Sequence, residues 1–318
     1  MMSAQLMMPP EQTGSRPIQA PSHVVMVRPH RFTVNAATAA DNAFQQSDSI
    51  DDADAARGAY GDATRLAEAL RQEGVTVSLF EDASGESPDS VFPNNWFTTH
   101  PDGRIVLCPM YAPNRRNERR EDVIDQLRND FAVTEVLDWT AAELDGQFLE
   151  GTGAVVIDHE QQVAYGCRSE RLTADLFTRF CREFGLLPVL FDAVDSSGRA
   201  VYHTNVMMSV GETLAVVGAD LIPDPVERDE VLGLLRASGR TVVELTEEQV
   251  RAFAGNVMQL RGAHGPVVVM STTAAAALHA DQLRAIRAHS RILSVDLSTV
   301  EVSGGSVRCM LAGIHLPH

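Results

Sequence analysis

The sequence predicts a mixed α/β fold in which a unit of two strands, a helix and a third strand repeats along the chain. The order of the elements recurs every roughly 50–60 residues, a period typical of propeller-like and array architectures. A chain of 318 residues can bury a large core, and its composition of 44% hydrophobic and 22% charged residues is that of a globular protein. In a closed ring, equivalent strand ends converge on the axis, so residues distant in sequence can share one pocket.

The first unit begins with a short apolar strand at 24–27, which is followed after a loop by a helix within 51–73. Apolar residues in that helix repeat at helical spacing, and Gly74 is a natural helix terminator. Alternating apolar and polar residues at 75–80 then predict a second strand.

The remaining units follow the same order of elements. Pairs of strands joined by a turn are expected at 92–108, 148–166, 202–218 and 257–270. Helices are expected up to about residue 131 and at 170–183, 224–237 and 274–288. Single strands are expected at 134–137, 187–191, 241–245 and 292–295. A segment rich in glycine and serine at 301–317 closes the chain.

The chain is expected to form a single domain at 23–318 after a disordered tail at 1–22, which is rich in Pro, Gln, Ser and Met. A net charge of −17 argues against nucleic acid as a partner. No window approaches the roughly 20 apolar residues of a membrane span, and the N-terminus does not resemble a signal peptide. Four Cys without a CxxC pair fit a reduced, cytoplasmic protein. The sequence allows the protein to form a homo-oligomer.

Three residues suggest nucleophilic chemistry. Cys309 follows Gly304 and Gly305 and stands next to Arg308, a cation that would favour the nucleophilic thiolate. His203 could act as its acid and base, and Glu150 could orient the histidine. The alternatives are a buried core thiol, a structural histidine and, more weakly, a metal site; no HxH, HExxH or CxxC spacing supports a metal.

Five motifs together resemble the guanidino-group-modifying (amidinotransferase / arginine deiminase) superfamily, and most closely its citrulline-utilization hydrolase branch. They are Phe92-Pro-Asn-Asn-Trp, Leu149-Glu-Gly-Thr-Gly, Tyr202-His-Thr-Asn, Phe253-Ala-Gly-Asn-Val and Gly304-Gly-Ser-Val-Arg-Cys. The resemblance implies a pentein fold, with five ββαβ modules around a pseudo-fivefold axis and the active site at its centre.

The resemblance also implies roles for individual residues. Cys309 would attack the carbon of a guanidino or ureido group, and His203 would protonate the leaving amine and then activate water. Glu150 would bind a substrate nitrogen and His203. The implied partner is a small amino-acid substrate, and no cofactor is implied.

The sequence departs from the arginine-processing pattern at two positions, where Asn95 and Asn205 replace carboxylates. An amide has no charge and offers both donors and an acceptor, which suits a ureido group better than a guanidinium cation. We therefore expect citrulline to be hydrolysed to ornithine, CO2 and ammonia. Turn and backbone hydrogen bonding is the alternative explanation for both Asn. Phe92 and Asn94 are further candidates for substrate binding.

Arg115, within a basic loop, and Arg171 are candidates to bind the substrate carboxylate, although basic runs often form a solvated start of a helix. Asp102 is expected to be a turn residue. Alternative activities are those of an arginine deiminase, an arginine dihydrolase, a dimethylarginine hydrolase or an amidinotransferase. A catalytically silent binding protein of the same fold is the alternative outside the enzymes.

Overall fold

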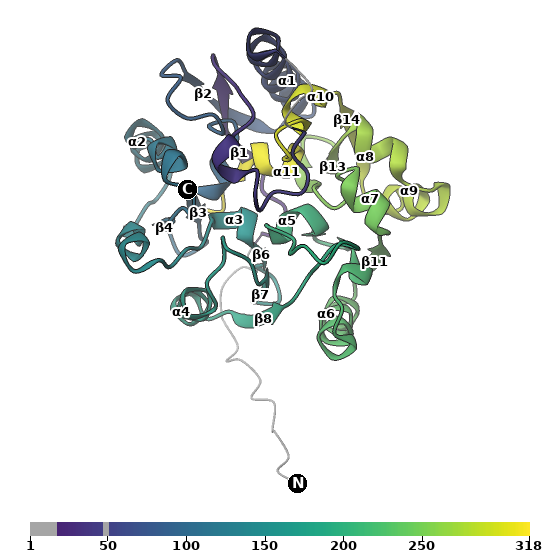
Figure 1. Ribbon diagram of the computed structural model, residues 1–318. Coiled ribbons are helices and arrows are strands. Elements are labelled where there is room, and N and C mark those ends of the chain that lie inside the picture. Colours follow the sequence, from purple (N-terminus) through teal and green to yellow (C-terminus); the bar gives the residue numbers. More distant parts are fainter. Residues whose placement is uncertain (1–17, 47–50) are drawn as a thin grey trace.

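The computed structural model describes residues 18–46 and 51–318, which form five three-stranded sheets arranged around a central axis (Figure 1). Each sheet combines one antiparallel and one parallel strand pair. This is the predicted pentein architecture. The strands of four sheets are β3 (Phe97–Thr99), β4 (Arg104–Leu107) and β5 (Glu135–Asp138); β6 (Val155–Asp158), β7 (Val163–Cys167) and β8 (Leu187–Phe191); β9 (Met208–Val210), β10 (Leu214–Val217) and β11 (Thr241–Glu244); β12 (Met258–Gly262), β13 (Gly265–Ser271) and β14 (Arg291–Val295).

The fifth sheet is built from both ends of the described chain and closes the ring. Strand β1 (His23–Pro29) pairs in parallel with β2 (Thr76–Asp82) and antiparallel with β15 (Ala312–Gly313). The inner strand of this module therefore comes from the end of the chain and its other two strands from the beginning. This pairing makes the closing segment part of the same ring as the other modules.

Helices surround the sheets at the rim of the ring (Figure 1). They are α1 (Asp52–Gln72), α2 (Glu121–Asp130), α4 (Ala174–Phe184), α6 (Pro225–Ala237), α7 (Glu247–Arg251), α8 (Thr272–Ala277), α9 (Ala280–Arg287) and α10 (Ser298–Glu301). The Asp51 side chain accepts from the Ala53 amide and caps α1, whose Leu66 and Leu70 are fully buried. The helix predicted at 274–288 is divided in two, because a capping box of His279 and Gln282 starts a new helix.

The sequence-based prediction assigned too much strand to the segments that approach the axis. Single helical turns precede the inner strands there: η2 (Pro93–Asn95), α3 (Gly151–Ala154), α5 (Thr204–Met207) and α11 (Val307–Met310). Such turns are too short to show helical periodicity, so the apolar residues around them resemble continuous strand. The other short 3-10 helices are η1 (Ala36–Thr38), η3 (Pro113–Glu118), η4 (Thr140–Asp145) and η5 (Ala219–Leu221).

Residues 18–22, which lie before the predicted boundary at residue 23, are packed against the ring. Gln19 is buried, and its side-chain amide donates to the carbonyls of Ile157 (3.0 Å) and Val210 (2.9 Å) and accepts from the amide of His159 (2.7 Å). Residues 18–22 therefore pack on the ring, while residues 1–17 of the predicted tail lie outside the described residues.

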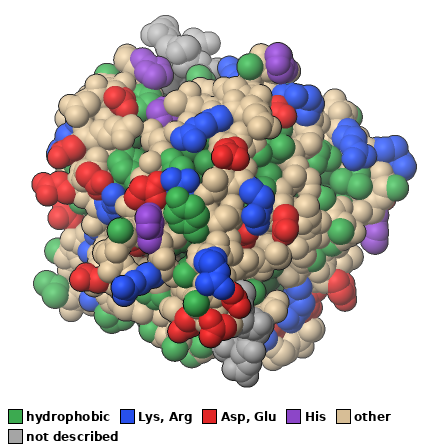
Figure 2. All heavy atoms as spheres, turned by 90° about the horizontal axis from the view of Figure 1, so that it is seen from above, with side chains coloured by type: hydrophobic (Ala, Val, Ile, Leu, Met, Phe, Trp, Pro, Cys, Tyr) green, Lys and Arg blue, Asp and Glu red, His purple; other side chains and the backbone are tan. Residues whose placement is uncertain are grey.

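None of the helices within 18–46 and 51–318 is long and apolar enough to cross a membrane. On the face shown in Figure 2, basic side chains (blue) and acidic side chains (red) are interspersed. The excess of negative charge in the sequence is therefore not gathered into one area of that face.

Candidate active site

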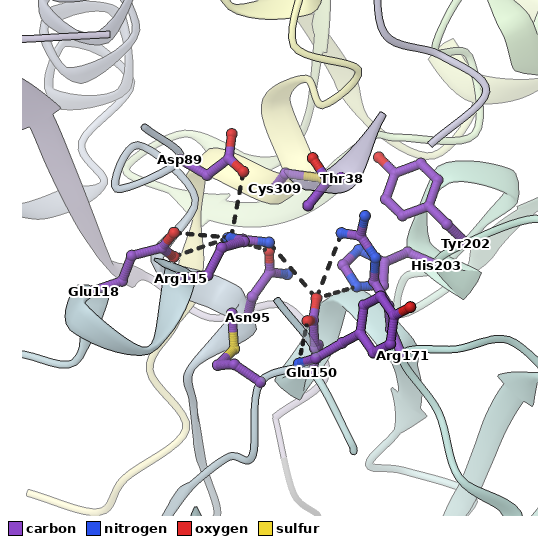
Figure 3. A network of polar contacts seen from close by, with 12 residues as sticks. Thr38, Asp89, Asn95, Arg115, Glu118, Glu150, Arg171, Tyr202, His203 and Cys309 are labelled. Carbon is purple, nitrogen blue, oxygen red and sulfur yellow. Dashed lines mark hydrogen bonds and ion pairs between the residues drawn. The ribbon is translucent and has the colours of Figure 1, made fainter. Parts of the chain in front are cut away.

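The predicted catalytic residues come together because the inner strands all start at the same end of the ring. Glu150 and His203 stand immediately before α3 and α5, and Cys309 lies on α11, close to the axis (Figures 1 and 3). Their exposed fractions are 0%, 1% and 3%. The ring thus places a carboxylate, an imidazole and a thiol, which come from three modules, around one buried point.

Glu150 and His203 form a buried pair in which the histidine is neutral. His203 Nε2 lies 2.9 Å from Glu150 Oε2. Burial lowers the pKa of His203 to about 4, and this outweighs the hydrogen bond to Glu150, which raises it. Burial alone would raise the pKa of Glu150, but Arg171, His203 and Arg115 hold it well below its usual range. Because a carboxylate only accepts, neutral His203 carries its proton on Nε2, which leaves Nδ1 free as a base.

Two amides surround the sulfur of Cys309. The side-chain amides of Asn205 and Asn256 donate to Sγ at 3.5 Å and 3.3 Å. Asn256 also donates to the Asn205 carbonyl (3.0 Å) and accepts from the Arg308 amide (3.1 Å). These contacts fix the amide of Asn256, and both Asn205 and Asn256 present an N–H to the sulfur.

Asn256 was not among the residues predicted for the site. Its motif, Phe253-Ala-Gly-Asn-Val, entered only as part of the resemblance. The repeat offered a signal, because Asn256 precedes β12 as Asn95 precedes β3. Polar residues at the start of every inner strand were therefore candidates for the site.

Asn95 is oriented by Arg115, whose Nη2 donates to Asn95 Oδ1 (3.0 Å). Arginine has only donors, so the oxygen of Asn95 must face it and the amide nitrogen must face the other way. That nitrogen donates to Asn94 Oδ1 (3.1 Å). It also lies against Gly153, where an added Cβ would meet both Asn95 and the ring of His203.

Arg115, predicted as a candidate to bind the substrate carboxylate, lines the cavity and already has buried carboxylate partners. It is 2% exposed and forms a bidentate pair with Glu118 (both 2.8 Å), with Asp89 and Glu150 at 3.5 Å and 3.6 Å (Figure 3). Burial raises the pKa of Glu118 to about 7, although Arg115 lowers it. The loop looks basic and solvated in the sequence because some of its partners come from other segments.

Arg171 lies on the opposite side of the same cavity and already has a carboxylate partner. Its Nε and Nη2 donate to Asp41 at 2.8 Å and 3.2 Å, and its guanidinium stacks on the ring of Tyr202, 4.7 Å from the centroid. Nη1 lies 3.6 Å from Glu150. Asp41 thus occupies the fork that a substrate carboxylate would use.

The cavity between these side chains is small and lies beneath the segment 35–46. Its wall includes residues of several segments besides the catalytic candidates His203 and Cys309; they are Thr38, Asn42, Phe92, Asn95, Arg115, Arg171, Tyr202 and Ser303. Its volume of about 10 Å³ is close to the space needed by a single water molecule. A substrate of amino-acid size therefore requires the covering segment to move.

Asp89 contributes a buried acceptor that no motif in the sequence had singled out. It lines the cavity and is 4% exposed, and its Oδ2 accepts from Asn35 (2.7 Å). Its Oδ1 is buried without a hydrogen-bond partner among the described residues. An unpaired buried carboxylate oxygen is costly, so this position suits a donor brought by a ligand.

The remaining predicted residues have other surroundings. Asn94 is fully buried behind Asn95, and its Nδ2 has no partner within the described chain. Asp102 accepts from the Arg104 amide (3.1 Å) in a turn, as expected. The guanidinium of Arg308 donates to the Leu311 carbonyl (3.0 Å) and lines a different cavity. Within the described ranges, no group of three His, Cys, Asp or Glu could hold a metal ion.

Solved structures share this fold. The N-terminal domain of ArgZ, an arginine dihydrolase from the ornithine-ammonia cycle in cyanobacteria, solved as a cysteine-to-serine mutant bound to substrate, matches with a TM-score of 0.69 at 15% identity, covering 93% of this chain and 98% of that one. Unliganded AgrE matches with a TM-score of 0.71 at 16% identity, and the match covers 93% of this chain and 39% of that one. A cysteine-to-serine mutant of DDAH from Pseudomonas aeruginosa, complexed with citrulline, matches with a TM-score of 0.63 at 16% identity. This match covers 93% of this chain and 100% of that one. No curated protein matches the chain.

The family comparison covers nearly the whole described ring. Residues 28–316 match the family described as N,N dimethylarginine dimethylhydrolase, eukaryotic. The matched range begins near the end of β1 and runs past β15, so it contains four complete modules, most of the fifth and every residue of the site. The chain therefore belongs to the N,N-dimethylarginine dimethylhydrolase family, within the guanidino-group-modifying pentein superfamily.

Proposed function

We propose that the protein is a Cys309-dependent hydrolase that converts citrulline to ornithine, CO2 and ammonia. The observation that carries the proposal is the pair of amides, Asn205 and Asn256, within 3.5 Å of the Cys309 sulfur. Asn95 lines the cavity beside Cys309, whereas Asn205 and Asn256 contact the sulfur from outside that lining. The side chains that contact the sulfur are therefore uncharged amides, which match a neutral ureido group.

The carboxylates near Cys309 do not offer a guanidinium cation two free charges. Glu150 is held by His203 and two arginines, and Glu118 is held by Arg115. A buried guanidinium without carboxylate partners would be costly, whereas a ureido group carries no charge to compensate. The electrostatics thus favour citrulline over arginine at the reacting carbon.

The chemistry can be written with the residues present. Cys309 Sγ attacks the ureido carbon, and its proton passes to the free nitrogen of neutral His203. The imidazolium, stabilised by Glu150, protonates the leaving amine and leaves a thiocarbamate on Sγ. His203 then deprotonates a water that attacks the same carbon. The C–S bond breaks, the imidazolium returns its proton to Sγ, and the carbamic acid released gives CO2 and the second amine.

The backbone of the amino acid has matching partners in the cavity. The unpaired Oδ1 of Asp89 can accept from an α-ammonium group, and Arg171 can bind an α-carboxylate if Asp41 moves away. Both assignments require the segment 35–46 to open, because Asp41 belongs to it. Binding of the substrate and opening of this segment are therefore coupled.

A second candidate is hydrolysis of arginine or of a methylated arginine. The family match over residues 28–316 favours it, and so does the unpaired oxygen of Asp89, which could accept from a guanidinium instead of an ammonium group. The two candidates share the nucleophile and base, and differ in the charge of the group beside Asn205.

The test is a product assay with citrulline, arginine and NG,NG-dimethylarginine. Ornithine released from citrulline, and its loss in Cys309→Ser, would support the proposal. Cys167→Ser is the matched control, because Cys167 is also buried but lies on β7, outside the cavity. Turnover of arginine or dimethylarginine with inert citrulline would refute the preference, and no turnover of any of them would refute the function.

A further inference from the structure

The ring has a second, larger cavity at the end opposite the site. The inner strands run from the catalytic end, and each residue of strand advances the chain by about 3.3 Å. At their far ends stand His100, His159 and His315, which follow β3, β6 and β15. These histidines, with Ile157 and Leu316, line a cavity of about 610 Å³, a size typical of sites for small molecules.

A deeper compartment of about 40 Å³ adjoins this cavity at His159 and His315 and contains Arg308. Arg308 follows Val307 on the helical turn that carries Cys309, but its guanidinium donates to the Leu311 carbonyl (3.0 Å). It takes part in no ion pair with any described carboxylate, and burial lowers its pKa to about 10. A cation that is largely shielded from water and lacks a counter-charge favours an anionic ligand.

The other charged groups around this cavity are already paired. Asp102 accepts from Arg104 Nε (2.8 Å), and Arg261 is paired with Glu212 at the rim. Each of the three histidines faces a small set of charged or polar groups. His100 faces Asp102, Arg104 and His315, and His159 faces His315, His100 and Arg308. His315 faces Arg308 and the Ile18 carbonyl, and the wall also includes His23 and His318. Among the described residues of this region, Arg308 is thus the arginine left without a carboxylate.

The histidines provide donors for an anion. His159 packs on His315 with ring centroids 4.0 Å apart, and its ring nitrogens have no hydrogen-bond partner among the described residues. His315 Nδ1 lies 3.1 Å from the Ile18 carbonyl, so Nδ1 carries the proton of the neutral ring. Nε2 of His315 can therefore donate only after it gains a proton. Burial keeps both rings neutral, with the pKa of His315 lowered to about 4.

The larger cavity, of about 610 Å³, adds apolar surface beside Arg308, His159 and His315. Phe131, Phe184, Ile314 and Leu316 form part of its wall. A bare inorganic anion would leave these side chains unused. We propose that this cavity binds a small organic acid, with its acidic group between Arg308, His159 and His315 and its apolar part against Phe131 and Phe184.

The test is titration calorimetry of the whole chain with benzenesulfonate and, separately, with sulfate, at constant ionic strength. Neither anion titrates near neutral pH, so any proton uptake belongs to the protein. Saturable binding of benzenesulfonate is expected to be tighter than that of sulfate. Its affinity should rise as the pH falls from about 8 to about 6, by up to about tenfold per unit for each proton bound.

Arg308→Gln should weaken binding at least about tenfold, the loss expected for a charge-assisted contact. Arg261→Gln, at the rim and paired elsewhere, should leave it unchanged. His159→Gln provides a second variant if Arg308→Gln unfolds, as judged by its melting temperature. Absence of saturable binding, or equal affinity in wild type and Arg308→Gln, would overturn the site. Equal affinity for benzenesulfonate and sulfate would overturn the proposed contact with Phe131 and Phe184. An affinity for benzenesulfonate that does not change with pH would overturn the role of His315.

Discussion

Gly153→Ala tests whether the geometry around His203 and Asn95 governs activity. An ideal Cβ at position 153 would lie 2.3 Å from Asn95 Nδ2 and 2.9 Å from His203 Nδ1 and Cε1. Ordinary contact begins near 3.4 Å, so the amide of Asn95 must retreat by 3.4 − 2.3 = 1.1 Å and the imidazole by 3.4 − 2.9 = 0.5 Å. Both groups are buried and hydrogen-bonded, so neither can swing freely into solvent.

A displacement of about 1 Å in a catalytic group can cost about 100-fold in rate, and overpacking a core costs about 1–3 kcal/mol of stability. We therefore expect kcat/KM of Gly153→Ala to fall about 100-fold, with a modest loss of Tm. The assay is steady-state ornithine release from citrulline together with thermal unfolding.

Gly233→Ala is the matched control, because a Cβ there would meet nothing within 4 Å on helix α6. It should keep full activity and gain up to about 1 kcal/mol of stability from its better helix propensity. Wild-type kcat/KM in Gly153→Ala would refute the placement of His203 and Asn95. An equal loss of activity in both variants would show that the loss in Gly153→Ala does not come from the contacts with His203 and Asn95.

Individual contacts lead to three more expectations. Asn256→Asp replaces the donor that faces Cys309 Sγ by an acceptor, so alkylation of Cys309 by iodoacetamide at neutral pH should slow by at least about tenfold, the cost of one charge-assisted hydrogen bond; an unchanged rate would contradict this role. Asp41→Asn weakens the partner of Arg171 and should lower KM for citrulline by up to about fivefold, or about 1 kcal/mol; a raised KM would show that Asp41 aids binding. The pKa of His100 is lowered to about 3 by burial, so the unfolded chain binds a proton that the folded chain excludes, and stability falls as the pH drops from about 6.5. His100 should contribute about 2 kcal/mol to the loss between pH 7 and 5, and His100→Gln, measured by urea unfolding at both values, should lose that much less.

The sequence was sufficient for the architecture because repetition leaves a signal in the order of elements. Helix α1 and strand β8 lie almost where the hydrophobic pattern placed them. The helical turn that follows His203 and the one that contains Cys309 were predicted as strand or loop, because four residues show no period.

Site residues could be predicted from the sequence where their own chemistry singled them out. They could not be predicted where their role depends on the residues that lie around them in the fold. Cys309, His203 and Glu150 stand out by their chemistry, and the ring gathers them. Asn256 and Asp89 look like ordinary loop residues until Cys309 and Arg115 are placed beside them. The burial of Arg115 was hidden for the same reason, since its three carboxylate partners come partly from other segments.

The central claim is that Cys309 attacks a neutral ureido carbon, and the ratio of kcat/KM for citrulline to that for arginine tests it most directly. The account predicts a ratio well above one in the wild-type protein. It also predicts a lower ratio in Asn95→Asp/Asn205→Asp, where carboxylates would favour a cation. A wild-type ratio below one, unchanged by the two substitutions, would contradict the account.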